Sequence, residues 1–152
     1  DLFADIREFH EKFNLVYIGK PRALPVDLLA FRTKFLYEEV DEYNEDSEAL
    51  SDALQRETPD NVEDANDVTQ SLALQLDALV DLVYVAVGTA YLHGFDFNEA
   101  WRRVHAANMK KIRATKASDS KRGSTHDVVK PPGWTPPDHT DLVTDHAHRE
   151  TA

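Results

Sequence analysis

The chain has 152 residues, enough for one domain with a hydrophobic core. It contains no cysteine, which excludes disulfides, thiolate metal sites and cysteine nucleophiles, and its formal net charge of -11 argues against binding to the phosphate backbone of nucleic acids. No apolar run approaches the ~20 residues that span a bilayer, and the acidic N-terminus lacks the basic region of a signal peptide, so we expect a cytoplasmic protein that binds neither membrane nor nucleic acid.

Apolar residues at spacings of three and four predict two helices in the first third of the chain. The first covers residues 2–14, and the second runs from about Val26 to Asn44. Between them, residues 19–25 contain one glycine and two prolines, which break helices. The polar residues from Glu45 to about Val68 include Pro59-Asp60-Asn61 and predict a short helix followed by an exposed loop.

A third helix is predicted from roughly Thr69 to Leu92, where His93-Gly94 is a typical C-terminal signal. This helix is apolar around most of its circumference, as is usual in the middle of a bundle or at an oligomer interface. Asp96 or Asn98 then caps a fourth helix that runs through about Arg113.

The rest of the chain is rich in proline between Pro131 and Pro137 and shows no periodicity. We therefore expect an all-α fold: a four-helix bundle over residues 1–115, and an extended tail over residues 116–152 that packs partly on this body. Because four helices leave the third one incompletely covered, we expect oligomerisation to complete the bundle. The expected assembly is a homodimer or homotetramer with the third and fourth helices at the interface.

The second helix carries three carboxylates along one edge. At 100° per residue, Glu38 and Glu42 lie about 40° apart, and Glu39 lies about 60° from Glu42 on the other side. Like charges at this spacing destabilise a helix unless something compensates them. A solvated acidic face is one interpretation, and a cation site is the other.

The third helix carries an acidic pair, Asp77 and Asp81, one turn apart in the most apolar segment of the chain, with no Lys or Arg from Glu57 to Tyr91. We expect this pair to be buried and to bind metal, or alternatively to meet an arginine or lysine from another helix. Five carboxylates on two facing helices suit hard cations such as Mg²⁺ or Mn²⁺. Such ions clamp a phosphoanhydride and activate water.

Charge is unevenly distributed along the chain. Between Asn44 and Asp67 there are nine acids and one base, Arg56, whereas bases concentrate after Ala100. A site for metal-bound polyphosphate needs both kinds of cluster, and solvated surface is the alternative interpretation of most of these charges.

Together these features resemble the MazG-type, all-α nucleotide pyrophosphohydrolases, which include the phosphoribosyl-ATP pyrophosphohydrolases and the dimeric dUTPases. The likeness covers roughly residues 26–138 and begins with Glu38-Glu39-x-x-Glu42. It is closest to the phosphoribosyl-ATP pyrophosphohydrolase-like proteins of bacteriophages, through residues 77–84, 88–90, 104–111 and 128–137. One departure concerns the third helix, where the general pattern has Glu three residues before the Asp; this chain has Ala78 there, with its acid at Asp77.

The resemblance implies a set of metal ligands. Glu39, Glu42 and Asp81 would hold the ions, about two to three Mg²⁺ or Mn²⁺ per site, with Asp77 as an additional ligand. Glu38 would bind a further ion or orient the attacking water. Glu38 and Glu39 are therefore the expected catalytic residues.

The resemblance also implies substrate-binding residues. Asn108 and Lys111 match the Asn-Met-x-Lys element of the family and would contact the nucleotide. Lys34, one turn before Glu38, and Lys130 in the tail are candidates for binding phosphate, with a surface lysine as the alternative in each case.

The implied reaction is hydrolysis of a nucleoside triphosphate to the monophosphate and pyrophosphate. The phage likeness points to a deoxynucleotide such as dGTP, and to the host cytoplasm if the chain is phage-encoded. The alternative function is a non-catalytic, acidic helical binding module, favoured by residues 44–67 and by the proline-rich tail. Such a module has no need for the acidic pair in the third helix.

Overall fold

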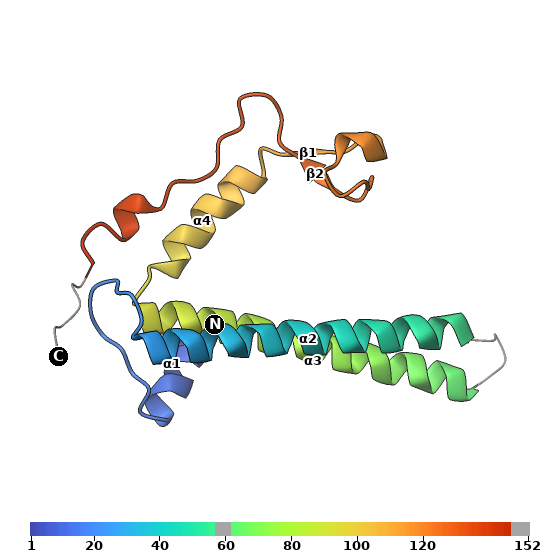
Figure 1. The fold of residues 1–152 in the computed structure, drawn as a ribbon, viewed down its shortest axis with the longest axis horizontal. Coiled ribbons are helices and arrows are strands. Elements are labelled where there is room, and N and C mark those ends of the chain that lie inside the picture. The colour runs from blue at the N-terminus through green and yellow to red at the C-terminus, as the bar shows by residue number, and fades with distance from the viewer. Residues whose placement is uncertain (57–61, 147–152) are drawn as a thin grey trace. The chain divides into compact units, whose positions relative to one another are not determined.

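The structure is a computed structural model that describes residues 1–56 and 62–146, and these residues are mostly helical (Figure 1). The described helices are α1 (Leu2–Lys12), α2 (Val26–Arg56), α3 (Val62–His93) and α4 (Phe97–Asn108). The all-α fold is confirmed. The chain forms two compact units, Asp1–Gly19 with Ala23–Gly94 and Lys20–Arg22 with Phe95–Ala152. The division into residues 1–115 and 116–152 stays a prediction.

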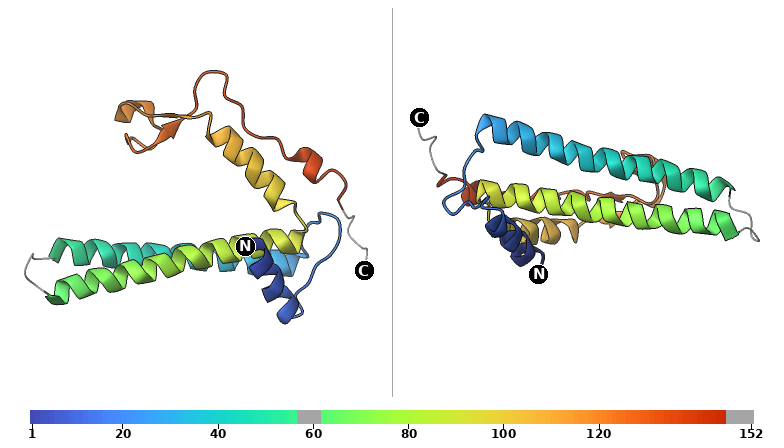
Figure 2. Two further views of the ribbon diagram at one scale, coloured as in Figure 1. Left: turned by 180° about the vertical axis from the view of Figure 1, so that it is seen from behind. Right: turned by 90° about the horizontal axis from the view of Figure 1, so that it is seen from below.

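The long helices α2 and α3 make up most of the first unit and lie side by side, antiparallel (Figures 1 and 2). Both are longer than the sequence predicts. Helix α2 continues to Arg56 instead of ending near Asn44, and α3 begins at Val62 instead of near Thr69. The loop predicted at Pro59-Asp60-Asn61 lies outside the described residues.

The polar residues after Asn44 extend α2 because polarity alone does not end a helix. Glu, Ala, Leu and Gln are good helix formers, and no glycine or proline interrupts the chain before Pro59. Contacts with α3 add to this preference, since Ala53 is buried and Gln75 Nε2 donates a hydrogen bond to Ser47 Oγ at 2.9 Å. The extension lengthens the surface along which acids of α2 and α3 face each other.

Helix α1 packs against α3 around a buried histidine. Nδ1 of His10 lies 2.9 Å from the carbonyl oxygen of Leu15, and the imidazole ring stacks on Tyr91 with centroids 4.6 Å apart. A Cβ at Gly88 of α3 would lie 3.1 Å from Nε2 of His10 and 3.2 Å from Nη2 of Arg32. The glycine therefore permits the close approach of α1 and α2 to α3.

Arg32 joins α2 to α3. Its Nε donates to Thr89 Oγ1 at 3.0 Å, and its Nη2 donates to the Val85 carbonyl oxygen at 2.8 Å. The guanidinium also lies over the ring of Phe35, at 5.3 Å from the centroid. The residue is buried because it lies on the side of α2 that packs against α3. Burial lowers the pKa of Arg32 from its usual value.

We expect the stability of the chain to fall as the pH falls below 6.5, because of His10. Burial lowers the pKa of His10 below 6.5; the hydrogen bond to Leu15 opposes this shift and the charge of Arg32 adds to it. The unfolded chain therefore takes up a proton that the folded chain resists, so this stability is complete above pH 6.5 and declines below it. Urea unfolding from about pH 8 to about pH 5 measures the slope, and His10→Gln should flatten it. An unchanged slope in the variant would contradict the assignment.

The second unit begins with α4, whose predicted N-cap is confirmed at Asp96: its side chain accepts a hydrogen bond from the Glu99 backbone N–H at 3.0 Å. The predicted end near Arg113 is wrong, because α4 ends at Asn108. Residues Ile112–Arg113 form a short strand, β1, that pairs antiparallel with β2 (Val128–Val129). The pairing partner lies well over ten residues away in the sequence, so the local periodicity near Arg113 does not reveal it.

Two 3-10 turns, η1 (Ala117–Asp119) and η2 (Thr140–Leu142), complete the second unit. The chain after β2 is anchored to α4 at two points. Trp134 Nε1 donates to the Ala107 carbonyl oxygen at 2.8 Å. Arg103 donates to both carboxylate oxygens of Asp141, at 2.6 and 2.8 Å. The proline-rich segment is therefore tied to α4 by specific contacts.

By length and composition alone, Ala65–His93 within α3 is apolar enough to cross a bilayer. A central helix of a helical bundle passes the same test. Asp77 and Asp81 lie near the middle of the segment, where a carboxylate in a bilayer costs roughly 3 kcal/mol. The apolar surface of α3 is therefore better suited to contacts with protein.

Candidate functional site

Glu39 is the buried member of the carboxylates on α2. It exposes 6% of its surface, whereas Glu38 and Glu42 are exposed. The difference follows from helical geometry: Arg32, Phe35 and Glu39 recur at spacings of three and four, and this side of α2 faces α3. The three carboxylates are recognisable in the sequence, but only the packing of α2 on α3 shows that Glu39 is the one shielded from solvent.

One oxygen of the Glu39 carboxylate lacks a hydrogen-bond partner. Its Oε2 is buried and makes no hydrogen bond with any residue in the described part of the chain. Burial raises the pKa of Glu39, and the negative charges of Glu42, Asp81 and Glu38 raise it further, in that order. A buried carboxylate without a partner destabilises the fold, and a hard divalent cation is the kind of partner that an all-oxygen environment suits.

Asp77 and Asp81 were expected to be buried against Leu76, Leu79, Val80 and Val85, and this expectation is wrong. Both aspartates are exposed, and so are their apolar neighbours Leu76, Leu79 and Val80. The alternative ion pair with a base is also not observed, since neither carboxylate contacts a Lys or Arg among the described residues.

The two aspartates do face the acids of α2. Asp81 is close enough to Glu39 to raise its pKa. Asp77 and Glu42 line a small recess of about 170 Å³ between α2 and α3. The structure therefore brings the acids of both helices together, in a loose cluster rather than a closed shell: within residues 1–56 and 62–146, no three His, Asp or Glu side chains are placed to share one metal ion.

The recess also includes two acids that the sequence analysis did not single out, Glu45 and Asp46. They were assigned to the polar segment after the second helix because that helix was predicted to end at Asn44. In the continuous α2, they follow Glu42 by three and four residues and share its side of the helix. This spacing could have indicated that Glu45 and Asp46 belong with Glu42, but it applies only if the helix continues beyond Asn44.

Lys34 forms an ion pair with Glu38, with Nζ 3.2 Å from Oε1, at an exposed position one turn earlier on α2. Exposed pairs of this kind stabilise a helix by only about 0.3–0.5 kcal/mol. In this structure Lys34 neutralises part of the acidic edge, so its availability for phosphate depends on breaking a weak contact.

The three remaining predicted residues belong to the second unit. Asn108 is the exposed last residue of α4. Lys111 precedes β1 and Lys130 follows β2, and both ammonium groups lie over the ring of Trp134, at 5.4 and 4.7 Å from its centroid. The structure thus brings Lys111 and Lys130 together.

The sequence also matches a known protein family. The model of the phosphoribosyl-ATP pyrophosphohydrolase family matches residues 6–108, which include α2, α3 and every carboxylate of the cluster. No curated protein matches the chain. Members of this family are pyrophosphohydrolases, enzymes that cleave a phosphoanhydride bond with water, and the match covers well over half of the sequence. This chain belongs to the phosphoribosyl-ATP pyrophosphohydrolase family.

Proposed function

We propose that the chain is a divalent-metal-dependent pyrophosphohydrolase that converts a (deoxy)nucleoside triphosphate to the monophosphate and pyrophosphate. The observation that carries the proposal is the buried, unpartnered Oε2 of Glu39, surrounded by the charges of Glu42, Asp81 and Glu38. Family membership favours this activity over a non-catalytic binding module. Such a module also has no use for a destabilising buried carboxylate.

Each carboxylate has a distinct task in this proposal. Glu39, Glu42 and Asp81 would hold Mg²⁺ or Mn²⁺, with Asp77 as an additional ligand. The ions, when bound, supply positive charge for the phosphates and a water of lowered pKa. Glu38, exposed at the edge of the cluster and paired with Lys34, orients the attacking water. Water adds across the phosphoanhydride, and its proton passes to the acidic cluster or to solvent.

In the second unit, Asn108 and Lys111 are the proposed nucleotide-binding residues, and Lys130 is a proposed source of positive charge for phosphate. The charge of this unit supports these roles. Among the described residues the second unit has eleven Lys and Arg against seven Asp and Glu, although the whole chain carries a net charge of -11. The proposed partners are the nucleotide substrate and further copies of the chain. We propose that the enzyme acts in the cytoplasm, and in the host cytoplasm if it is phage-encoded.

A panel of nucleoside and deoxynucleoside triphosphates tests the function. With Mg²⁺ or Mn²⁺ present, we expect release of pyrophosphate and the monophosphate in equal amounts, with dGTP as the proposed preferred substrate. Release of single phosphate groups would contradict the pyrophosphohydrolase reaction. A preference for another base would revise the substrate and leave the reaction in place.

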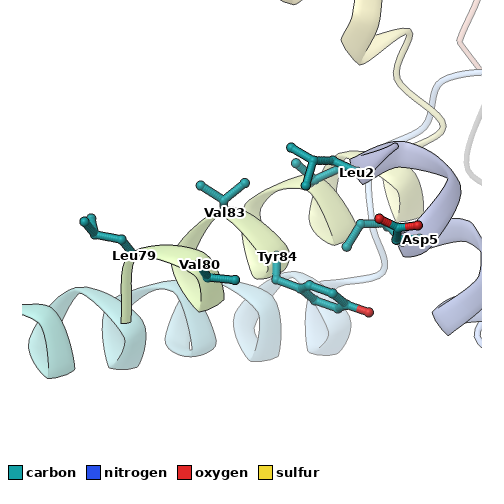
Figure 3. A pocket seen from close by; sticks show the side chains of 8 residues that line it. Leu2, Asp5, Leu79, Val80, Val83 and Tyr84 are labelled. Atoms are coloured by element: carbon teal, nitrogen blue, oxygen red, sulfur yellow. The ribbon is translucent and has the colours of Figure 1, made fainter. Parts of the chain in front are cut away.

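We also propose that a second copy of the chain covers the apolar face of α3. Large apolar side chains on this helix are 43–65% exposed. They are Leu72, Leu76, Leu79, Val80 and Val83, which share one side of the helix. Beside them, a groove of about 440 Å³ between α1 and α3 is lined almost wholly by apolar atoms, including those of Leu2 and Tyr84 (Figure 3). An apolar surface of this extent is typical of an oligomer interface.

Light scattering at micromolar concentration should therefore give a dimer or tetramer rather than the 17.2 kDa monomer. Val83→Glu places a charge in the middle of the apolar face and should shift the distribution to monomer. Ile18→Glu is the matched control, because Ile18 is 90% exposed in the segment between α1 and α2 and lies outside the apolar face of α3. A wild-type monomer, or equal effects of the two variants, would refute this interface.

A further inference from the structure

Side-chain hydrogen bonds join α2 to α3 on both sides of the acidic cluster. The cluster consists of four carboxylates: Glu39, Glu42, Asp77 and Asp81. On one side of it, Arg32 of α2 donates to Thr89 Oγ1 and to the Val85 carbonyl oxygen of α3. On the other side, Nε2 of Gln75 in α3 donates to Oγ of Ser47 in α2 at 2.9 Å. The acids of the two antiparallel helices therefore lie between two polar contacts.

The hydroxyl of Ser47 accepts the hydrogen bond from Gln75 because its own proton is already used. Ser47 Oγ donates to the backbone carbonyl oxygen of Tyr43, one turn earlier in α2, at 2.7 Å. A hydroxyl has one proton and two acceptor lone pairs, so the NH₂ group of the glutamine side chain is its complementary partner. Ser47 and Gln75 are both half-buried, which limits competition from water. The contact is therefore defined in direction as well as in position.

Apolar packing between α2 and α3 is weak around this contact. The side chains that are buried in this part of the two helices are small: Ala53, Ser71 and Ala78. Larger apolar side chains of the same part of α3, such as Leu74, are exposed. Small side chains bury little apolar area, so a hydrogen bond forms a larger share of what holds the helices together here than it does in an ordinary core.

Negative charge opposes the packing of the two helices at the same place. Glu42, Glu45, Asp46 and Asp77 line the recess between α2 and α3. Within the described residues none of these acids forms an ion pair with a base, so their mutual repulsion is not compensated in the metal-free protein. Ser47 directly follows Asp46, and its partner in α3 precedes Asp77 by two residues. The hydrogen bond thus joins the helices next to the acids that push them apart.

We propose that Ser47 and Gln75 are positioning residues for the metal site: their contact holds α3 against α2, so that acids of both helices face each other before any cation binds. This assignment rests on the proposed function, because it takes the acidic cluster as the site of the divalent ion. Without the contact, repulsion moves the metal-free helices apart, and ion binding has to bring them back. The free energy of that step is subtracted from the affinity for the ion.

Binding of Mn²⁺ without nucleotide, measured by calorimetry, tests the proposal. Ser47→Ala should weaken Mn²⁺ binding about two- to tenfold, the range that one hydrogen bond contributes. Alanine is the better helix former, so α2 itself is preserved. Ser47→Thr keeps the hydroxyl and should bind Mn²⁺ as the wild type does.

Ser51→Ala is the matched control. Oγ of Ser51 also accepts a hydrogen bond from a glutamine, Nε2 of Gln55 at 3.2 Å, but both residues belong to α2. This variant removes the same chemical contact without touching the link between the helices, so its affinity for Mn²⁺ should equal that of the wild type. Equal losses for Ser47→Ala and Ser51→Ala would overturn the proposal.

A variant on the other helix separates positioning from simple stability. Gln75→Ala should weaken Mn²⁺ binding as much as Ser47→Ala, and the double variant should lose little more, because both changes remove one contact. Additive losses would overturn the shared role. Thermal melts of the metal-free proteins give the second readout: a variant that melts earlier but binds Mn²⁺ normally would show a structural role only. If Ser47→Ala does not fold, Gln75→Ala decides the proposal by the same two measurements.

Hydrolysis and metal binding distinguish this proposal from the proposed function. If Mn²⁺ binding depends on the contact but no triphosphate is hydrolysed, the proposed function fails and the positioning role stands. If hydrolysis is observed and both alanine variants bind Mn²⁺ normally, the positioning role fails and the function stands. Saturating Mn²⁺ should restore the rate of Ser47→Ala, because the bound ions bring the helices back together. A rate that stays low at saturation would overturn the proposal, as would a wild type that binds no Mn²⁺.

Discussion

Replacing Glu39 by Gln should reduce pyrophosphate release roughly a hundredfold or more. Glu39 is the buried carboxylate of the cluster, and Gln keeps its shape while removing the charge that would hold a divalent ion. Losing one group that stabilises charge in a transition state typically costs on the order of 10²–10³ in rate. Removal of divalent ions with EDTA should abolish the activity of the wild-type protein, and full activity in excess EDTA would contradict metal dependence.

The same variant should be more stable than the wild type at neutral pH when no metal is present. Burial raises the pKa of Glu39 above 4.5, so the stability linked to its protonated form is fully present below pH 4.5 and is lost as the pH rises through the raised pKa. Glu39→Gln avoids that loss. The two proteins should therefore differ at neutral pH and converge below pH 4.5, as measured by thermal melts across this range.

With a divalent metal ion present, the wild type should be more stable than Glu39→Gln. At ~100-fold excess over the dissociation constant, a ligand that binds only the folded state stabilises it by about 2.7 kcal/mol. Mn²⁺ should raise the melting temperature of the wild type and have little effect on Glu39→Gln. Asp81→Asn should also lose activity and metal response, but with little change in the metal-free melt, because Asp81 is exposed. Asp41→Asn, an exposed acid of α2 outside the cluster, is the control and should behave as the wild type. An unchanged response to Mn²⁺ in Glu39→Gln would remove Glu39 from the metal site.

Arg32→Ala should destabilise the chain by roughly 3 kcal/mol. The change removes two hydrogen bonds from a charged, buried donor, to Thr89 Oγ1 and the Val85 carbonyl oxygen, and leaves a cavity between α2 and α3. Hydrogen bonds of charged groups contribute about 1.5–3 kcal/mol each when the partner is buried. Urea unfolding at fixed protein concentration measures the loss, since dissociation of an oligomer would otherwise contribute.

Two further variants test whether the contacts of Arg32 with α3 cause the loss of stability in Arg32→Ala. Lys34→Ala removes an exposed base from the same helix and should cost at most about 0.5 kcal/mol. Thr89→Val leaves Nε of Arg32 without its acceptor, and its loss should not add to that of Arg32→Ala, because both remove one contact. Equal losses for Arg32→Ala and Lys34→Ala would show that Arg32 does not join the two helices.

The helical class and the order of the helices were determined by the sequence alone. Apolar spacing of three and four along residues 2–14, 26–44 and 69–92 is a local property, and His93-Gly94 ends α3 as predicted, with Gly94 at a φ of 70°. The identity of the acidic residues was also visible, because three carboxylates on one helical edge and a pair on the next are short-range patterns. The family resemblance rested on the same residues, and the family match confirms it.

The tertiary structure decided which of these acids loses contact with water. From the sequence, Asp77 and Asp81 were expected to be buried because their neighbours in α3 are apolar, yet both are exposed and Glu39 is buried. Apolar neighbours predict burial only where another element covers them, and α2 covers the side of α3 that faces Glu39. Strand β1, the extension of α2 to Arg56 and the grouping of Lys111 with Lys130 over Trp134 likewise depend on partners distant in the sequence. Local periodicity determines which face of an element is apolar, and only packing determines what covers it.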